Sequence, residues 1–135
     1  MRFLDTNVLL YAISADPGER DKTERANRIL ASRDVGLSVQ VLQEFYVQAT
    51  RATGQGALSH NHAARLVESF TRFPVLNLTP GLALAAMATC HRFQISYWDA
   101  AIIQAAAALR CGVVLSEDMN DGQEYDGVRV QNPFV

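Results

Sequence analysis

The sequence is short of lysine and cysteine, and each shortage excludes a class of protein. Lys22 is the only lysine among twelve basic residues. Receiver domains and haloacid-dehalogenase-type phosphatases need a lysine well after the first strand, so both are excluded. Asn7 also stands where the phosphatases need a second aspartate. The two cysteines, Cys90 and Cys111, have no characteristic spacing, which argues against a disulfide framework.

Glycine-rich phosphate loops and long apolar runs are missing as well. No Gly-x-Gly-x-x-Gly pattern follows the first apolar segment, and the Walker lysine motif is absent, so nucleotide-binding domains of these two kinds are excluded. No apolar run approaches the roughly 18 residues that a membrane span requires. We therefore expect a cytoplasmic protein without membrane attachment.

The charge balance is close to neutral. Twelve basic and fourteen acidic residues give a net charge of −2, so the broad basic surface typical of non-specific nucleic-acid binding is absent. An enzyme that holds phosphates through a metal ion does not need such a surface. Basic residues do cluster between residues 20 and 33. They form either the solvated face of a helix or an edge that contacts phosphates or a partner.

The 135 residues, 49% of them hydrophobic, predict a single domain over residues 1–135. Short apolar segments alternate with segments of helical periodicity. Because fully apolar strands are typical of parallel sheets covered on both faces, this pattern predicts a three-layer α/β/α sandwich with a mainly parallel sheet of about five short strands. The expected strands cover residues 1–5, 35–38, 74–78, 113–115 and 128–130, and the expected helices begin after Asp5 and cover 21–33, 40–53, 62–72, 80–92 and 97–110.

Several helix ends carry local signals. Thr6 or Asn7 is expected to cap the first helix, and Ser38 the helix that starts near residue 40. Gly54 is expected to end that helix, and Gly112 the helix over 97–110. These signals place most of the acidic residues of interest at strand ends or in first helical turns.

Asp5 directly follows the first strand, where open α/β sheets place their chemistry. Glu44, Asp99 and Asp118 hold comparable positions at strand ends or helix starts. Four carboxylates that converge on one cleft repel each other unless a cation lies between them. The sequence therefore predicts a metal site, with helix capping as the alternative role of Asp5.

Asp99 also fits a helix-capping role. Ser96 and Asp99 match the capping box, in which the acid reaches back to the amide of the capping serine. Yet Asp99 shares its helical face with Ile102 and Ile103, where a lone charge is costly. A cation would compensate that charge, so the metal-ligand interpretation is preferred.

The other two acids are less clearly assigned by pattern alone. The loop after the fourth strand contains five acids, and periodicity does not decide which of Glu117, Asp118 and Asp121 faces the cleft. Asp118 is the first choice and Asp121 a further candidate ligand. Glu44 lies on the flank of an apolar helical stripe, so periodicity by itself indicates a solvated helix residue.

Five short sequence segments, taken in order, resemble those of PIN-domain nucleases, and together they span essentially the whole chain. The segments are Phe-Leu-Asp-Thr-Asn at 3–7, Val-Leu-Gln-Glu-Phe at 41–45, Trp-Asp-Ala-Ala-Ile-Ile at 98–103, Leu-Ser-Glu-Asp at 115–118 and the tail from 126 to 134. The chain looks most similar to VapC-type toxins of bacterial toxin–antitoxin pairs. The usual acidic-x-acidic pattern after the fourth strand is altered, because Asn120 stands at the second acidic position.

The resemblance implies a hydrolase that cleaves RNA phosphodiester bonds with Mg²⁺ or Mn²⁺. Its acidic residues would be Asp5, Glu44, Asp99 and Asp118, with Glu44 acting through a water, Asp121 as a further candidate and Thr6 and Ser116 as supporting hydroxyls. It also implies a homodimer and a cognate antitoxin protein that occupies the acidic cleft. The alternative is a catalytically inactive PIN fold that serves as a binding module.

Overall fold

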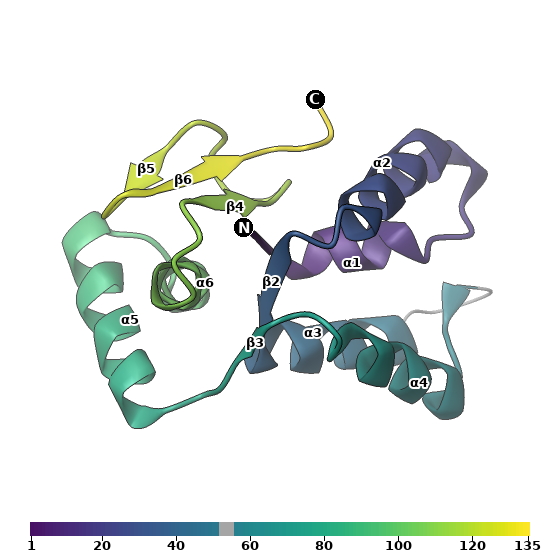
Figure 1. Ribbon diagram of the computed structural model, residues 1–135, viewed down its shortest axis with the longest axis horizontal. Helices are drawn as coiled ribbons and strands as arrows, with labels where there is room; N and C mark the ends of the chain where they lie inside the picture. Colours follow the sequence, from purple (N-terminus) through teal and green to yellow (C-terminus); the bar gives the residue numbers. More distant parts are fainter. Residues whose placement is uncertain (52–55) are drawn as a thin grey trace.

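A six-stranded sheet forms the centre of the protein. In the computed structural model, which describes residues 1–51 and 56–135, the strand order is β3-β2-β1-β4-β6-β5 (Figure 1). Neighbouring strands are parallel except for the last pair, β6 and β5. The strands are β1 (Arg2–Leu4), β2 (Val35–Ser38), β3 (Val75–Leu76), β4 (Val113–Leu115), β5 (Glu124–Tyr125) and β6 (Val128–Gln131).

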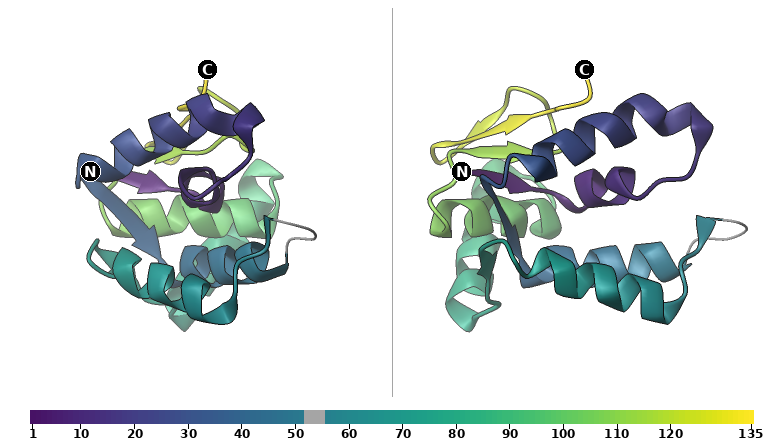
Figure 2. Two further views of the ribbon diagram at one scale, coloured as in Figure 1. Left: turned by 90° about the vertical axis from the view of Figure 1, so that its right-hand side faces the viewer. Right: turned by 45° about the vertical axis from the view of Figure 1, so that its right-hand side comes forward.

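Helices cover both faces of this sheet. Helix α2 lies on one face and α6 on the other (Figure 2), and α5 packs against α6. Helix α3 packs between α1 and α4. The layers confirm the predicted α/β/α sandwich with a mainly parallel sheet. The helices are α1 (Thr6–Ala12), the short 3-10 helix η1 (Pro17–Glu19), α2 (Arg20–Ala31), α3 (Val39–Arg51), α4 (His60–Phe70), α5 (Pro80–Phe93) and α6 (Tyr97–Ala108).

The central strands bury side chains on both faces, which explains why they read as continuous apolar runs. Phe3, Leu4 and Leu115 are fully buried. In the parallel ladder between β1 and β4, Leu4 pairs with Leu115, so the two strands end level with each other. The next residues, Asp5 and Ser116, therefore emerge side by side at the carboxyl edge of the sheet.

The sequence prediction missed the short strand β5. It pairs antiparallel with β6 through a two-residue turn at Asp126 and Gly127, whose φ angles are 50° and 83°. Asp-Gly is the favoured pair for such a turn, because both residues take positive φ. The turn signal was present, but a two-residue strand is too short to show alternation.

Two helix starts can be compared with their predicted caps. The prediction that Thr6 or Asn7 caps α1 is wrong, since Asp5 itself is the N-cap and accepts a hydrogen bond from the Thr6 amide. The prediction for the third helix is confirmed, because Ser38 Oγ accepts from the Val41 amide at 3.3 Å. Capping and a role in the site are therefore compatible at Asp5, and they are not alternatives.

Other boundaries shift by a few residues. The left-handed residue after α6 is Arg110, with φ of 60°, and Gly112 does not end the helix as expected. Helix α4 begins at residue 60, earlier than predicted, with Ser59 as its cap. The expected end of α3 at Gly54 lies outside the described residues. None of the helices in the described part of the chain is long and apolar enough to cross a bilayer.

Candidate active site

Asp5 lies at the centre of the site, between the ends of β1 and β4. It is 9% exposed, and it accepts hydrogen bonds from Ser116 Oγ at 2.7 Å and from the Thr6 amide at 2.8 Å. Burial raises the pKa of Asp5 to about 6, which the two hydrogen bonds partly oppose and the charges of Glu44 and Asp118 reinforce. The carboxylate is thus surrounded by neutral donors and like charges.

Glu44 is half-buried on α3 and does not behave as a solvated helix residue. Its Oε2 accepts a hydrogen bond of 3.1 Å from Thr6 Oγ1, and its Oε1 accepts one of 2.7 Å from Gln40 Nε2. Thr6 therefore contacts both acids of this region, Asp5 through its amide and Glu44 through its hydroxyl. Periodicity misplaced Glu44 because a half-buried polar contact leaves no mark in an apolar pattern.

Asp99 lies in the first turn of α6. Its amide donates to Ser96 Oγ at 3.0 Å, so the predicted serine cap is confirmed. Desolvation raises the pKa of Asp99, a hydrogen bond with the Ser96 side chain lowers it, and the charges of Asp118 and Glu44 raise it further. Glu44 and Asp118 therefore act electrostatically on both Asp5 and Asp99.

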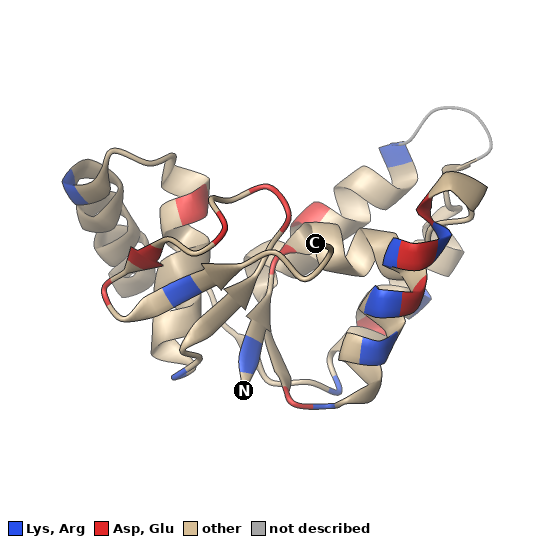
Figure 3. Ribbon diagram, turned by 90° about the horizontal axis from the view of Figure 1, so that it is seen from above, with Lys and Arg blue, Asp and Glu red and all other residues tan. Residues whose placement is uncertain are grey.

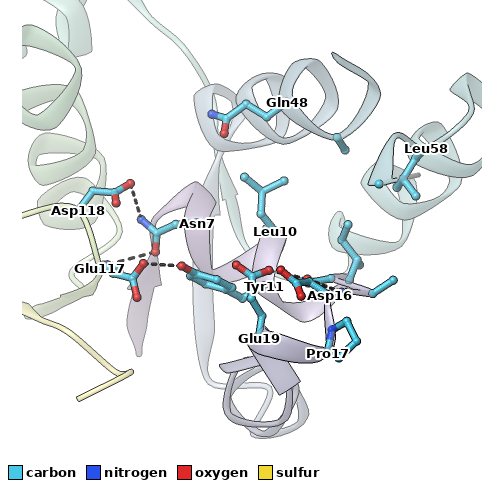
Figure 4. Close-up of a pocket in the computed structure, with 15 residues that line it drawn as sticks. Asn7, Leu10, Tyr11, Asp16, Pro17, Glu19, Gln48, Leu58, Glu117 and Asp118 are labelled. Atoms are coloured by element: carbon cyan, nitrogen blue, oxygen red, sulfur yellow. Dashed lines mark hydrogen bonds between the residues drawn. The ribbon is translucent and has the colours of Figure 1, made fainter. Parts of the chain in front are cut away.

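Asn7 links the acids on the β4 side, and the sequence prediction missed it as a site residue. Its Nδ2 donates to Asp118 at 3.2 Å and to Asp5 and Ser116 at 3.4 Å each. Its Oδ1 accepts from the Glu117 amide at 3.1 Å (Figure 4). The sequence prediction gave Asn7 a helix-capping role and a place in the 3–7 segment, but no part in the site. The signal that could have found it is its place two residues after Asp5, on the turn that faces the cleft.

The remaining acids of the β4 loop have other partners. Glu117 accepts a hydrogen bond of 2.5 Å from Tyr11 Oη (Figure 4). It accepts a second one, of 2.7 Å, from Lys22 Nζ. One oxygen of Asp121 accepts from the Asn132 amide at 2.9 Å, which ties the loop to the C-terminal segment. Of the three candidate acids in this loop, Asp118 is the one bound to the Asp5 network.

Basic side chains are scarce around this cleft. Four of the twelve basic residues lie on α2, the helix at the right edge of Figure 3, where acidic segments alternate with them, and further acidic segments lie near the middle of the molecule. Lys22 on α2 is committed to Glu117, and Arg25 binds the backbone oxygens of Pro133 and Val135. The α2 cluster is thus partly used in structural contacts.

The donor set fits a hard divalent cation. Carboxylate oxygens are the ligands that Mg²⁺ and Mn²⁺ prefer, and mutual repulsion among the acids is what a cation would remove. As the side chains stand in the described residues, no three Asp, Glu, His or Cys groups are gathered closely enough to hold a metal ion. The amide of Asn7 lies between Asp5 and Asp118, which accounts for part of their separation.

A groove of about 660 Å³ opens beside the acids, between α1, η1 and the α3–α4 region. Its floor is apolar, with Leu10, Ile13 and Leu58, and Figure 4 shows Asn7 and Asp118 at one end of it. Acidic side chains line its edge. They are Asp16, Glu19, Glu117 and Asp118.

Residues 2–121 match the PIN domain family, and the chain belongs to that family. No curated protein matches the sequence. The match confirms the family resemblance noted in the sequence and covers all four predicted acids.

Solved structures share the fold over almost the whole chain. One is a toxin–antitoxin complex from Klebsiella pneumoniae, with 18% identity, 98% of each chain covered and a TM-score of 0.72. A second is VapC20 of Mycobacterium tuberculosis, a sarcin-ricin loop cleaving toxin, with 21% identity, 87% of this chain and 92% of that chain covered and a TM-score of 0.67. A third is DNA-bound VapBC from Salmonella typhimurium, with 20% identity, 98% and 97% covered and a TM-score of 0.68. At these identities the likeness establishes the fold.

Proposed function

We propose that the protein is a metal-dependent endoribonuclease and the toxin of a toxin–antitoxin pair. The observation that carries this proposal is the buried carboxylate of Asp5, which neutral donors hold amid the charges of Glu44 and Asp118. Asp5 caps α1, but capping does not require the charges of Glu44 and Asp118 beside it, and a cation would remove that repulsion. The PIN family and the toxin structures of the same fold support RNA as the substrate.

Each site residue has a distinct part in this proposal. Asp5, Asp99 and Asp118 would hold Mg²⁺ or Mn²⁺, which supplies Lewis-acid activation of the phosphodiester and of the attacking water. Glu44 would contact the cation through a water. The hydroxyl of Thr6 orients Glu44 through a hydrogen bond, and the hydroxyl of Ser116 orients Asp5 in the same way. Asp121 remains a candidate ligand only if its bond to the Asn132 amide opens.

The groove beside the acids supports an antitoxin as partner. Its apolar floor can accept apolar side chains of a peptide, and its acidic edge is complementary to arginine or lysine. A basic side chain entering from this groove would reach Asp118 and occupy the place of the cation. The inhibitor would thereby block the site directly. The cytoplasmic location that such a pair implies stays a prediction.

A homodimer is supported by exposed apolar side chains on and around α3, α5 and α6. Isolated exposed apolar residues are ordinary, but neighbouring ones mark contact surfaces. Trp98 and Val47 line one hollow, and Trp98 and Leu78 line the next. Sedimentation of the purified protein tests this part of the proposal, and Trp98→Lys should shift a dimer toward monomer. The exposed set comprises Val47, Leu78, Leu84, Met87 and Trp98.

The first experiment is cleavage of a mixed panel of single-stranded and structured RNAs with Mn²⁺, with Mg²⁺ or with EDTA. Asp5→Asn is the test variant, and Asp21→Asn, an exposed change on α2, is the matched control. The proposal expects metal-dependent cutting by the wild type and Asp21→Asn proteins and none by Asp5→Asn. An absence of both cutting and Mn²⁺ binding, after any inhibitor is removed, would favour the inactive binding module.

A further inference from the structure

Gln40 is a buried polar side chain on α3, one helical turn before Glu44. It is 7% exposed and lines a small hollow next to Trp98. Its Nε2 donates a hydrogen bond of 2.7 Å to Glu44 Oε1. An amide at this depth needs a partner, because an unpaired polar group in the interior is costly. The motifs in the sequence did not single out this residue.

The two oxygens of Glu44 are held from two different helices. Gln40 binds one oxygen from within α3, and Thr6 binds the other from the start of α1 at 3.1 Å. A carboxylate only accepts hydrogen bonds, so the amide nitrogen of Gln40 must face it. Two fixed donors restrict rotation of the carboxylate and keep its charge within reach of Asp5 and Asp99, whose pKa values it raises.

Both of these donors are neutral, which has a chemical consequence. An arginine or lysine in place of Gln40 would orient Glu44 equally well, but it would cancel the negative charge and repel an incoming cation. A neutral amide fixes the orientation and leaves the full charge of Glu44 available to the site.

We propose that Gln40 is a positioning residue that holds Glu44 in the orientation used for RNA cleavage. This inference rests on the proposed nuclease function, because Gln40 acts only through Glu44. Gln40 does not line the antitoxin groove; it lines the hollow that Glu44 also lines.

A purely structural role makes a different prediction. A glutamine and a carboxylate four residues apart stabilise a helix by themselves. If that were the whole role, loss of Gln40 would lower the melting temperature and leave the turnover of the folded protein unchanged. A positioning role instead lowers kcat and weakens metal binding in protein that is fully folded.

The test variant is Gln40→Met, which keeps length and removes both amide donors. Gln43→Met is the matched control, because Gln43 lies on the same helix and is exposed. We expect Gln40→Met to lower kcat about 10- to 100-fold with KM for RNA nearly unchanged. Calorimetry without RNA should show weaker Mn²⁺ binding. In the Glu44→Gln background, Gln40→Met should have no further effect, since the pair acts as a unit.

A second variant guards against misfolding. Gln40→Asn keeps a buried amide but is too short to reach Glu44 in the same way, and it carries the same expectation. Equal kcat values for the Gln40 and Gln43 variants would overturn the inference. So would a double variant in which the kcat losses of Gln40→Met and Glu44→Gln multiply. Either result would leave the nuclease proposal intact. A wild-type protein that neither binds Mn²⁺ nor cuts RNA would reject both. In that event, a Gln40 side-chain amide resonance that shifts in Glu44→Gln would assign the contact a structural role only.

Discussion

Two glutamates flank the candidate site, and the protein holds them in opposite ways. Within residues 1–51 and 56–135, the side chains that donate hydrogen bonds to Glu44 are both neutral. Glu117 accepts from Tyr11 and from the ammonium group of Lys22, and the Lys22 bond is the main reason why its pKa is lowered. Glu117 is therefore ionised but already neutralised by its partner. The contrast shows that the chain directs its one lysine away from the acids that would bind a cation.

The largest expected effect comes from removing one glutamate at a time. Glu44→Gln should lower RNA cleavage by about 10²- to 10³-fold, because it removes a charge that the site uses. Glu117→Gln should leave kcat within about threefold of the wild-type value, because the charge of Glu117 is paired with Lys22. Cleavage rates with saturating Mn²⁺ measure both. Equal losses in the two variants would remove the distinction between the glutamates.

The next effect is a dependence of stability on pH in metal-free buffer. Burial raises the pKa of Asp5 from 3.8 to about 6, so between these values the folded protein binds a proton that the unfolded chain has lost. The contribution of Asp5 to stability is therefore fully present below pH 3.8 and lost as the pH rises through 6. The loss is on the order of 3 kcal/mol. Urea unfolding in EDTA at several pH values measures it.

Asp5→Asn is the control for that measurement, because it cannot ionise. The difference in unfolding free energy between wild type and Asp5→Asn should change between pH 4 and pH 7 and stay constant above pH 7. Added Mn²⁺ should restore the stability that the wild type loses and have little effect on the variant. A difference that does not vary with pH would mean that Asp5 is far more solvated than the structure indicates.

A smaller effect is expected at Asp99. In metal-free buffer, Asp99→Asn should raise the melting temperature by about 1–3 °C, because it relieves repulsion from Asp118 and Glu44 at a partly exposed site. Glu24→Gln, an exposed change on α2, serves as the reference. A fall in melting temperature would instead mean that the Asp99 carboxylate stabilises the start of α6 as a capping residue.

The smallest effect is expected from Lys22→Met. The lysine is exposed, so solvent screening limits what the bond to Glu117 contributes, and the melting temperature should fall by no more than about 2 °C. RNA cleavage should stay within about twofold. The pKa of Glu117, followed by NMR, should rise, because its main cause of lowering is gone. A large gain or loss of activity would show that Glu117 belongs to the site after all.

The sequence predicted the parts of the site that depend on strand ends. Asp5 and Asp118 follow apolar strands, which the sequence showed. That β1 and β4 are neighbours with Leu4 level with Leu115 came only from the structure. Hydrogen bonds between polar side chains of different elements do not show in the hydrophobic pattern of the sequence. Glu44 was recognised through the family resemblance and not through its pattern. Gln40 and Asn7 were missed because amide partners show only in three dimensions.

The sequence predicted the layers of the fold correctly, but it missed the short strand β5 and misassigned the cap of α1. Apolar runs identified the buried strands, since both faces of the sheet are covered. Strand β5, with two residues at the sheet edge, has no such run. The cap of α1 was misassigned because Asp5, Thr6 and Asn7 all offer suitable oxygens, and only the backbone geometry decides among them.

The position of β4 between β1 and β6 has a consequence for protein synthesis. Asp5 and Glu44 leave the ribosome early, whereas Asp99, Ser116 and Asp118 follow only when most of the chain has been made. Until β4 emerges, β1 lacks one of its two neighbours and Asp5 lacks the hydroxyl that binds it. A nascent chain therefore carries half of the acidic set and no assembled site. On the proposed nuclease function, RNA cleavage would therefore require nearly the whole chain to have been made.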